Sequence, residues 1–425
     1  MSPQAGGTRP APVRIDDLAE PRFGEEARAV LDFMQEAGAQ LSLDADALME
    51  AARAETGLDD FGAPDFVPRL ELLCRAMLDE GGFNAGGILQ QHTFILGLLK
   101  NRLLVEDLVR RHPEILHERI VAPIVICGLP RTGTTHLHNL MSADPALRSL
   151  PYWESLEPVL AQREQPVPGA PDPRLERTAM ALSFIDTAMP FFKRMHEMTV
   201  EHAHEEIQLL AIDFSTMLFE TTAPMPSWRD AYLARDQRPS YAYLRMVLQV
   251  LQWLRGGTRW VLKSPQHLEQ FPALLETFPD ATFVITHRDP VSVTASMATM
   301  IAYSARLTRD RVDVEACGSY WADRLVRMLR SCATDRDVLP AEQSIDVHFD
   351  EFMADDLAMV ERVYALAGQP LDGRSRAAMT AFMADHPRGR HGTVEYDLGQ
   401  FGLDAAERRE SLRFYTDRFG VTLES

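Results

Sequence analysis

An apolar run that leads directly into a glycine-containing loop restricts this chain to few folds. Residues 121–127 read VAPIVIC, residues 128–135 read GLPRTGTT, and an amphipathic stretch begins near Thr134. A short, continuously apolar run predicts a buried strand, and the amphipathic stretch predicts a helix. A loop between a strand and a helix can point backbone N–H groups at an anion, and the helix N-terminus favours negative charge there. The sequence therefore predicts an anion-binding loop at the end of a buried strand.

The same order of strand and helix recurs later in the chain. Further strands are predicted at 259–262, 281–286 and 344–349, and helices at 268–278, 291–304 and 355–367. Apolar strands that alternate with helices are typical of a parallel sheet covered on both faces. We therefore predict an α/β fold, a P-loop-like parallel sheet flanked by helices, with ligands at the carboxyl ends of the strands.

The rest of the chain divides into three predicted regions. Residues 1–20 begin with a stretch rich in Pro, Gly and Ala and are predicted to form a disordered tail. Residues 21–118 repeat apolar side chains every three or four positions, which indicates a helical subdomain. Residues 119–425 form the predicted α/β domain, with a mainly helical insertion at about 151–257. An insertion of this size at the ligand-binding edge is typical of a lid or substrate pocket.

The charge balance argues against several classes of partner. The 425 residues include 43 Lys and Arg against 62 Asp and Glu, a formal net charge of −19. Nucleic acids and anionic membranes are bound through clustered Lys and Arg, so neither partner is expected. Four scattered cysteines indicate a reducing compartment. The longest apolar runs fall short of the roughly 18 residues that span a bilayer. We expect a cytoplasmic protein and regard the sequence as compatible with a homo-oligomer.

The loop departs from the nucleotide-binding template GxxxxGK[ST] at one position. Both glycines and the final Thr135 match, but Thr134 stands where the template has lysine. That lysine and a Mg²⁺ neutralise the β- and γ-phosphates of a nucleoside triphosphate, so its absence argues against ordinary NTP hydrolysis. Arg131 supplies a cation earlier in the loop instead.

This loop resembles the 5′-phosphosulfate loop of sulfotransferases that use 3′-phosphoadenosine 5′-phosphosulfate (PAPS). It is most similar to the form with Arg in place of Lys, found in tyrosylprotein sulfotransferases and many bacterial relatives. The resemblance covers about residues 121–392 and implies that PAPS is the co-substrate and that no metal takes part. It also implies that the donor is bound by the loop residues Arg131, Thr132, Gly133, Thr134 and Thr135.

A second motif is similar to the 3′-phosphate site of the same family. Arg288 follows the strand predicted at 281–286, and Ser296 stands eight residues later. The guanidinium of Arg288 offers a planar fork to a phosphate, and Ser296 can add a hydroxyl from the next helix. Two anion sites at adjacent strand ends suit a nucleotide that carries phosphates at both the 3′ and the 5′ position.

Two further segments resemble the family more loosely. Lys263, in LKSPQH, is similar to the family's lysine near the bridging oxygen, which implies that it stabilises charge on the departing nucleotide. The run RGRHG at 388–392 is similar to the C-terminal loop that closes over the 3′-phosphate, which implies that Arg388 and Arg390 bind the donor.

Sulfuryl transfer by in-line attack also needs a base for the proton of the acceptor. Glu154, in LPYWE, is the first candidate, because it matches the catalytic Glu of tyrosylprotein sulfotransferases if two extra residues are allowed. In the cytosolic branch of the family the base is a histidine, so His267, His202 and His204 remain alternatives. The resemblance implies a hydroxyl of a small molecule as acceptor, with an amine as the less favoured choice.

Three other interpretations are weighed against this one. A divergent P-loop kinase or NTPase would depend on ATP and Mg²⁺, and a non-catalytic protein of the same fold would bind nucleotide without turnover. A metal site is suggested by HAHEE at 202–206 and by His196-Glu197. Residues two apart face nearly opposite ways on a helix, and Val200 stands where HExxH has its second histidine, so no metal is predicted.

Overall fold

Four parallel strands form the sheet in the computed structural model, which describes residues 10–165 and 169–424. Their order in space is β2, β1, β3, β4, with β1 at Ile124–Gly128, β2 at Val261–Ser264, β3 at Thr282–His287 and β4 at Ser344–His348. The register aligns Cys127 with Ser264 on one side and with Ile285 on the other. The carboxyl ends of β2, β1 and β3 therefore lie side by side. The predicted α/β fold with a P-loop-like parallel sheet is confirmed.

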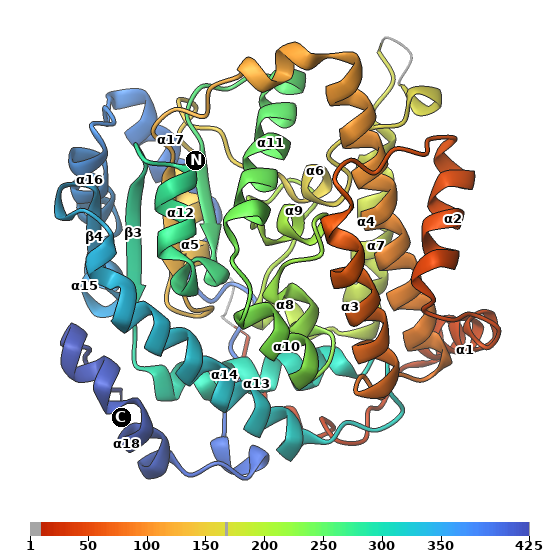
Figure 1. Ribbon diagram of the computed structural model, residues 1–425. Helices are drawn as coiled ribbons and strands as arrows, with labels where there is room; N and C mark the ends of the chain where they lie inside the picture. The colour runs from red at the N-terminus through yellow and green to blue at the C-terminus, as the bar shows by residue number, and fades with distance from the viewer. Residues whose placement is uncertain (1–9, 166–168, 425) are drawn as a thin grey trace, which may run out of the picture.

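Each face of the sheet is buried under its own helices (Figure 1). Along β1, Ile124 and Ile126 join a smaller apolar core, whereas Val125 and Cys127 join a larger one, as strand alternation requires. The smaller core is closed by α5 (Thr134–Ser142), α16 (Asp356–Ala367) and α17 (Gly373–Asp385). The larger core includes α11 (Arg238–Arg255), α12 (Phe271–Thr277), α13 (Pro290–Ala305) and α14 (Val314–Asp335). Burial on both faces explains why the strands are apolar throughout.

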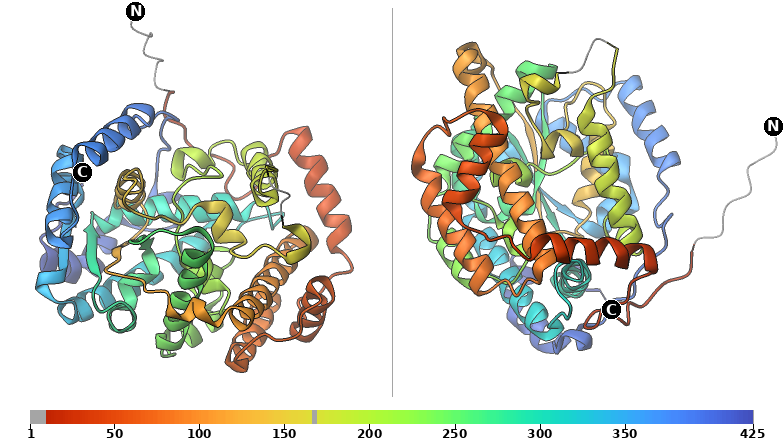
Figure 2. Two further views of the ribbon diagram at one scale, coloured as in Figure 1. Left: turned by 90° about the horizontal axis from the view of Figure 1, so that it is seen from above. Right: turned by 90° about the vertical axis from the view of Figure 1, so that its right-hand side faces the viewer.

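The N-terminal helices pack into the same larger core. They are α1 (Glu25–Gly38), α2 (Ala45–Thr56), α3 (Val67–Asp79) and α4 (Ala85–Arg111). Asp44 accepts a hydrogen bond from the N–H of Ala47 at the start of α2, and Gly57 follows the helix with a φ of 71°. Figure 1 shows these red and orange helices on one side of the sheet and the blue C-terminal helices on the other, and the view from above in Figure 2 agrees.

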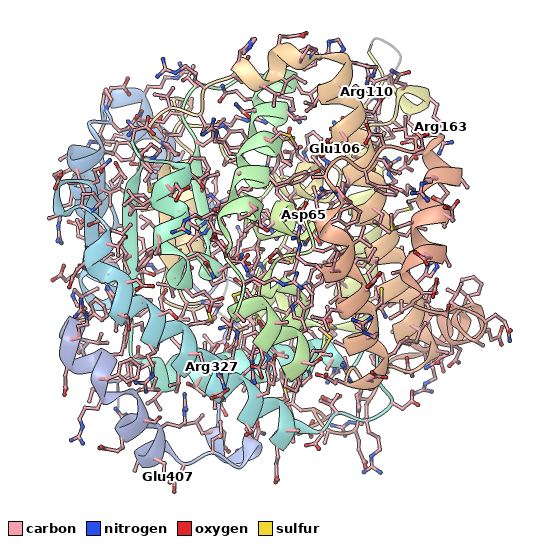
Figure 3. The ribbon with its side chains drawn as sticks, in the orientation of Figure 1. Asp65, Glu106, Arg110, Arg163, Arg327 and Glu407 are labelled. Atoms are coloured by element: carbon pink, nitrogen blue, oxygen red, sulfur yellow. The ribbon has the colours of Figure 1, made fainter. Side chains whose placement is uncertain are left out.

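A buried ion cluster fastens these helices to the insertion. Arg69 of α3 and Arg102 of α4 bind the carboxylate of Asp213 at 2.8 and 2.9 Å. Asp65, labelled in Figure 3, binds Arg69 at 2.9 Å. Ser240, at the start of α11, donates a hydrogen bond to the same Asp213 carboxylate at 2.6 Å. The N-terminal helices thereby fix the position of the insertion.

The remaining elements are all helices. The insertion contains α6 (Tyr152–Leu156), α7 (Pro173–Ala188), α8 (Phe192–Met195), α9 (Ile207–Ala211) and α10 (Pro226–Leu233), besides α11. Towards the C-terminus follow α15 (Phe349–Ala354) and α18 (Ala405–Phe419). Short 3₁₀ turns lie at Pro64–Phe66, Pro113–His117, Gln162–Glu164, Met217–Thr221, Pro265–Glu269, Arg336–Val338, Ala341–Gln343 and Leu398–Phe401. Among the described residues, no helix is long and apolar enough to cross a bilayer.

The predicted N-terminal tail is partly packed against the protein. Residues 1–9 lie outside the described residues. Val13 pairs with Val394 in an isolated parallel bridge, and its N–H donates to the carbonyl of Thr393 at 3.0 Å. Ile15 and Leu18 are buried in the larger core. The prediction of disorder up to residue 20 is therefore wrong for the segment from Val13 to Leu18, because its apolar side chains pack against the protein core.

Candidate active site

The loop of residues 128–135 makes a tight turn between β1 and α5. Arg131 and Gly133 have positive φ angles of 72° and 88°. This conformation is costly for a residue other than glycine and is frequent at functional sites. The Oγ1 of Thr132 donates to the carbonyl of Leu129 at 2.7 Å and lies 2.6 Å from the Oγ1 of Thr286 on β3. The loop is therefore braced against the neighbouring strand.

Arg288 lies directly beside this loop. Its Nη1 donates to the backbone carbonyl of Arg131 at 2.7 Å, and its guanidinium packs 4.1 Å from the ring centre of Phe349. Ser296 stands on α13, the helix that follows, and is buried. The structure thus brings the two predicted anion motifs to neighbouring strand ends.

Lys263 reaches the same edge from β2. Its side chain is buried and its Nζ pairs with Glu205, while its backbone N–H donates to Glu206 at 2.9 Å. The guanidinium of Arg131 donates to the carbonyl of Met195 at the end of α8. Both cations are therefore held by residues of the insertion.

Four histidines lie near enough to Lys263 to feel its charge, and His196 also feels that of Arg131: His138, His196, His202 and His204, here called the histidine group. Burial, together with the charge of Lys263, lowers the pKa of His138 and of His196 to about 3, and Arg131 adds to the effect on His196. Burial also lowers the pKa of His202 and of His204. All four rings are therefore neutral at pH 7, as a general base must be before it takes a proton.

The segment that carries His202 and His204 is extended, so the helix assumed for it in the sequence analysis is wrong. Ala203 pairs with Pro151 in an antiparallel bridge. Residues two apart in an extended segment face the same side. The two rings therefore meet, with 3.0 Å between Nε2 of His202 and Nδ1 of His204. No group of three or more potential metal ligands occurs within residues 10–165 and 169–424.

Two members of the histidine group were missed as candidate bases. His138 stands four residues after Thr134 on α5, a spacing that puts both on one helix face. His196 follows Met195, whose carbonyl binds Arg131, and its ring centre is 6.3 Å from that of His202. The alternation in His202-Ala203-His204 is the strand-like period that could have indicated an extended segment.

Glu154, the first predicted base, lies in a buried ion pair away from Arg131 and Lys263. Its carboxylate accepts from Arg148 at 3.0 Å and lies 3.6 Å from Arg255. Arg148 pairs with Trp260, which precedes β2, whereas Lys263 is the third residue of that strand. Burial raises the pKa of Glu154 even though Arg148 opposes this shift. Its observed contacts are those of a structural carboxylate.

His267 is also enclosed. One ring nitrogen contacts Glu206 at 2.5 Å and the other contacts the hydroxyl of Tyr241 at 2.8 Å. Glu206 in turn accepts the backbone N–H of Lys263. With both ring nitrogens bound, His267 supports the strand that carries Lys263.

Arg388 and Arg390 lie on opposite sides of their loop. Arg388 pairs with Asp356, which is also 3.4 Å from His136 on α5. Arg390 pairs with Glu197, the residue after His196. Arg388 therefore reaches towards the first turn of α5, and Arg390 reaches the insertion.

The buried polar atoms without a hydrogen-bond partner within the described residues include Nε of Arg131 and Oγ of Ser296. A buried donor without a partner costs about 1–3 kcal/mol. Both belong to residues predicted to hold the donor, so an anion bound here has free donors to meet. The site therefore fits a phosphorylated ligand.

Comparison with known proteins decides the family. Residues 123–373, more than half of the chain, match the model of the sulfotransferase family. The chain belongs to the sulfotransferase family. The matched range includes the loop, Lys263, Arg288 and Ser296, and it ends before Arg388. The family predicted from the sequence is confirmed, and the protein is a transferase.

Solved sulfotransferases share its fold over most of the chain. Sulfotransferase STF9 from Mycobacterium avium is 25% identical with a TM-score of 0.80, covering 91% of this chain and 99% of that one. STF1 from Mycobacterium tuberculosis H37Rv is 29% identical with a TM-score of 0.74, covering 86% and 97%. The omega-hydroxy-beta-dihydromenaquinone-9 sulfotransferase Stf3 of Mycobacterium bovis is 23% identical over 311 residues, 68% of this chain and 73% of that protein.

Proposed function

We propose that this sulfotransferase moves the sulfuryl group of PAPS to a hydroxyl of an apolar small molecule. The observation that carries the proposal is the meeting of three cations at neighbouring strand ends: Lys263 on β2, Arg131 after β1 and Arg288 after β3. Separate cations on adjacent strands suit a nucleotide with anions at both its 3′ and 5′ positions. PAPS would supply a sulfuryl group activated by its bond to phosphate.

The proposed donor site divides between the two anion motifs. Backbone N–H groups of the loop and the N-terminus of α5 would hold the 5′ end, with Arg131 beside them. Arg288 and Ser296 would hold the 3′-phosphate. The unpartnered Nε of Arg131 and Oγ of Ser296 support this division, because each is a donor free for one end of the ligand.

A member of the histidine group is the proposed base, with His196 first. His196 is half-buried and directly follows Met195, whose carbonyl binds Arg131; burial and then the charges of Lys263 and Arg131 lower its pKa. The acceptor oxygen would attack the sulfur as His196 takes its proton, and the sulfur–oxygen bond to the phosphate would break. Lys263 and Arg131 would stabilise the negative charge left on that phosphate oxygen. Glu154 lacks such neighbours.

The acceptor is proposed to enter beside the histidine group. A hollow of about 500 Å³ between α7 and residues 199–200 has a mixed lining, formed by Ala179, Leu182 and Val200 together with the polar Ser183, Asp186, Thr187 and Thr199. The N–H of Thr199 donates to Nδ1 of His202 at 3.1 Å. The relative Stf3 is named for a hydroxylated menaquinone. A small molecule with apolar and polar parts would suit this lining, and its hydroxyl would then lie near His202.

Ligand-induced stabilisation tests the donor. We expect the 3′,5′-bisphosphate product of PAPS (PAP) to stabilise the protein by about 2.7 kcal/mol at a hundredfold excess over its dissociation constant. AMP lacks the 3′-phosphate and should stabilise it much less at the same concentration. Equal stabilisation by AMP and PAP would contradict the proposed 3′-phosphate site. A larger shift with ATP and Mg²⁺ would instead favour a kinase or NTPase.

Turnover tests the remaining alternative. A non-catalytic protein would bind PAP tightly and transfer no label from ³⁵S-labelled PAPS to any hydroxylated acceptor. We expect transfer to alcohols with an apolar body, and not to short polar alcohols. Transfer to amines in preference to alcohols would contradict the proposed acceptor group.

A further inference from the structure

We propose that the C-terminal segment 422–424 occupies the 3′-phosphate site and must leave Arg288 before the donor binds. The inference rests on the proposed function, because the site in question is the one assigned to the 3′-phosphate. It adds a regulatory contact within the chain, in which the carboxylate of Glu424 competes with the nucleotide.

Glu424 accepts two hydrogen bonds from Arg288, as a phosphate could. Nε and Nη2 of Arg288 donate to the two carboxylate oxygens of Glu424 at 2.5 and 2.9 Å. Hydrogen bonding to Arg288 holds the pKa of Glu424 below its usual value, and Ser292 on α13 contributes. Nη1 of Arg288 is taken by the carbonyl of Arg131 at 2.7 Å. Glu424 fills the Nε–Nη2 edge of the guanidinium, and Nη1, which forms part of the other edge, is bound to Arg131, so a phosphate that takes the Nε–Nη2 edge must displace the carboxylate.

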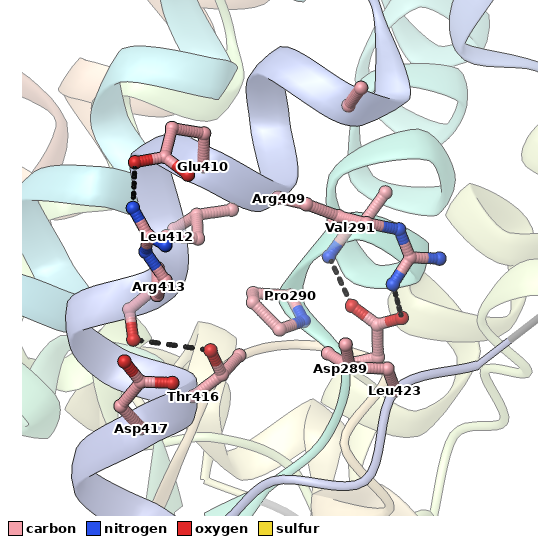
Figure 4. A pocket seen from close by; sticks show the side chains of 11 residues that line it. Asp289, Pro290, Val291, Arg409, Glu410, Leu412, Arg413, Thr416, Asp417 and Leu423 are labelled. Atoms are coloured by element: carbon pink, nitrogen blue, oxygen red, sulfur yellow. Dashed lines mark hydrogen bonds and ion pairs between the residues drawn. The ribbon is translucent and has the colours of Figure 1, made fainter.

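Further polar contacts hold the segment to Asp289 after β3, to Arg409 on α18 and to Asp350 on α15. The N–H of Glu424 donates to Asp289 at 2.8 Å, and its carbonyl accepts from Arg409 at 2.7 Å. Thr422 donates to Asp350 at 2.9 Å. Figure 4 shows Arg409 directed at Asp289, with Leu423 beside them, around a pocket of about 280 Å³.

These contacts suit a segment that can be displaced. Leu423 lines this pocket yet remains 53% exposed, so release costs little apolar burial. The side chains of Arg288 and Glu424 are 22% and 36% exposed, and ion pairs this close to solvent contribute little stability. Val421, which is buried, keeps the end of α18 in place while residues 422–424 move. A doubly charged phosphate can therefore replace the singly charged carboxylate.

Nucleotide affinity of a charge-neutral variant tests the competition. We expect Glu424→Gln to bind PAP about two- to fivefold more tightly than the wild type, the range of a partly exposed ion pair. Affinity for AMP should be unchanged, because AMP has no 3′-phosphate. The matched control is Glu410→Gln, which removes the same charge from an exposed ion pair with Arg413 on α18 and should change neither affinity. Isothermal titration calorimetry measures all six values.

Hydrogen exchange gives a second readout on the unaltered protein. The peptide that covers residues 420–424 should exchange faster with saturating PAP than with saturating AMP, because PAP frees the N–H of Glu424 from Asp289. Slower exchange with PAP, or weaker PAP binding by Glu424→Gln, would show that Glu424 belongs to the donor site and would overturn the inference.

The two proposals fail in different ways. If the wild type binds PAP and Glu424→Gln binds it equally well, the displacement is refuted and the sulfuryl-transfer proposal stands. If neither binds PAP, the proposed donor is refuted and the displacement with it. If only the variant binds PAP, the displacement is supported in its strongest form.

Discussion

At the residue scale, every cation assigned to the donor already has a partner within the protein. Carboxylates hold four of them, in the pairs Lys263–Glu205, Arg288–Glu424, Arg388–Asp356 and Arg390–Glu197, and a backbone carbonyl holds Arg131. The proposed binding of the donor would therefore require these cations to exchange protein partners for the nucleotide. An acidic chain of net charge −19 supplies such partners readily. Such an exchange would lower affinity, because each ion pair within the protein must be broken before its cation can bind the donor.

Replacement of His196 tests the proposed base. We expect His196→Asn to lower kcat by about 10²–10⁴, the usual contribution of a general base, and to leave the dissociation constant of PAP unchanged. Steady-state kinetics and calorimetry measure the two quantities.

Matched variants distinguish the other candidates. Glu154→Gln and His267→Gln should retain kcat per folded molecule, since both residues are enclosed by partners. If only Glu154→Gln lowers kcat, Glu154 is the base. If only His202→Asn lowers kcat, His202 is the base in place of His196.

The pH dependence follows from the lowered histidine pKa values. A group whose pKa is lowered keeps its neutral form to more acidic pH than free imidazole, and His196 has a pKa of about 3. We therefore expect kcat/KM to stay level as pH falls from 8 through 6.5, where an ordinary histidine would become charged. A descending limb with its midpoint near 6.5 would count against this base. The profile should be recorded over the pH range in which the fold remains intact.

At the scale of elements, close packing between β1, its loop and β3 fixes the site. A Cβ at Gly128 would lie 1.9 Å from Oγ1 of Thr286 and 2.8 Å from Cγ2 of Thr134. This glycine therefore serves a contact between neighbouring strands, in addition to any role in anion binding. The hydroxyls of Thr132 and Thr286 meet in the same place.

A substitution at Gly128 tests this packing. We expect Gly128→Ala to lower the free energy of unfolding by about 1–3 kcal/mol, as overpacking usually does. The double variant with Thr286→Ala should recover part of that loss, because the nearest clashing atom is removed. Urea unfolding of the single and double variants measures the coupling. If Gly128→Ala lowers the free energy of unfolding equally with and without Thr286→Ala, the clash with Thr286 is not the source of the loss.

The sequence predicted the elements near the sheet well and those of the insertion poorly. Strands such as β1 are apolar throughout because both faces are buried, which is a local and readable pattern. The extended segment at Ala203 depends on Pro151, some fifty residues away, so its conformation is set by a tertiary contact. The prediction for Glu154 relied on its position shortly after the loop in the sequence. In the structure it pairs with Arg148, which lies beside the start of β2.

At the scale of the whole molecule, segments near residue 13 and near residue 424 contact elements that carry residues of the proposed donor site. Val13 pairs with Val394 just beyond the loop of Arg390, and Glu424 binds Arg288. Asp17 binds Arg306, at the end of α13, at 2.7 Å. Motif spacing could place Arg288 and the loop, but not these partners, because no local pattern records contacts between residues 136 or more positions apart.

The packed N-terminal segment should contribute to stability. We expect Leu18→Ala to lower the free energy of unfolding by about 2–4 kcal/mol, because Leu18 is buried in the larger core. Asp16→Ala is the control, since the Asp16 side chain is 76% exposed and its loss should cost under about 0.5 kcal/mol. Urea titration measures both. If Leu18→Ala leaves the free energy of unfolding unchanged, the segment contributes little to stability.

The contact between Val13 and Thr393 also bears on when the protein can mature during its synthesis. Val13 leaves the ribosome 380 residues before Thr393 does, so their hydrogen bond cannot form until residue 393 has been translated. The sheet strands up to β4 can assemble before that moment. Nascent chains stalled short of residue 393 should therefore lack this contact.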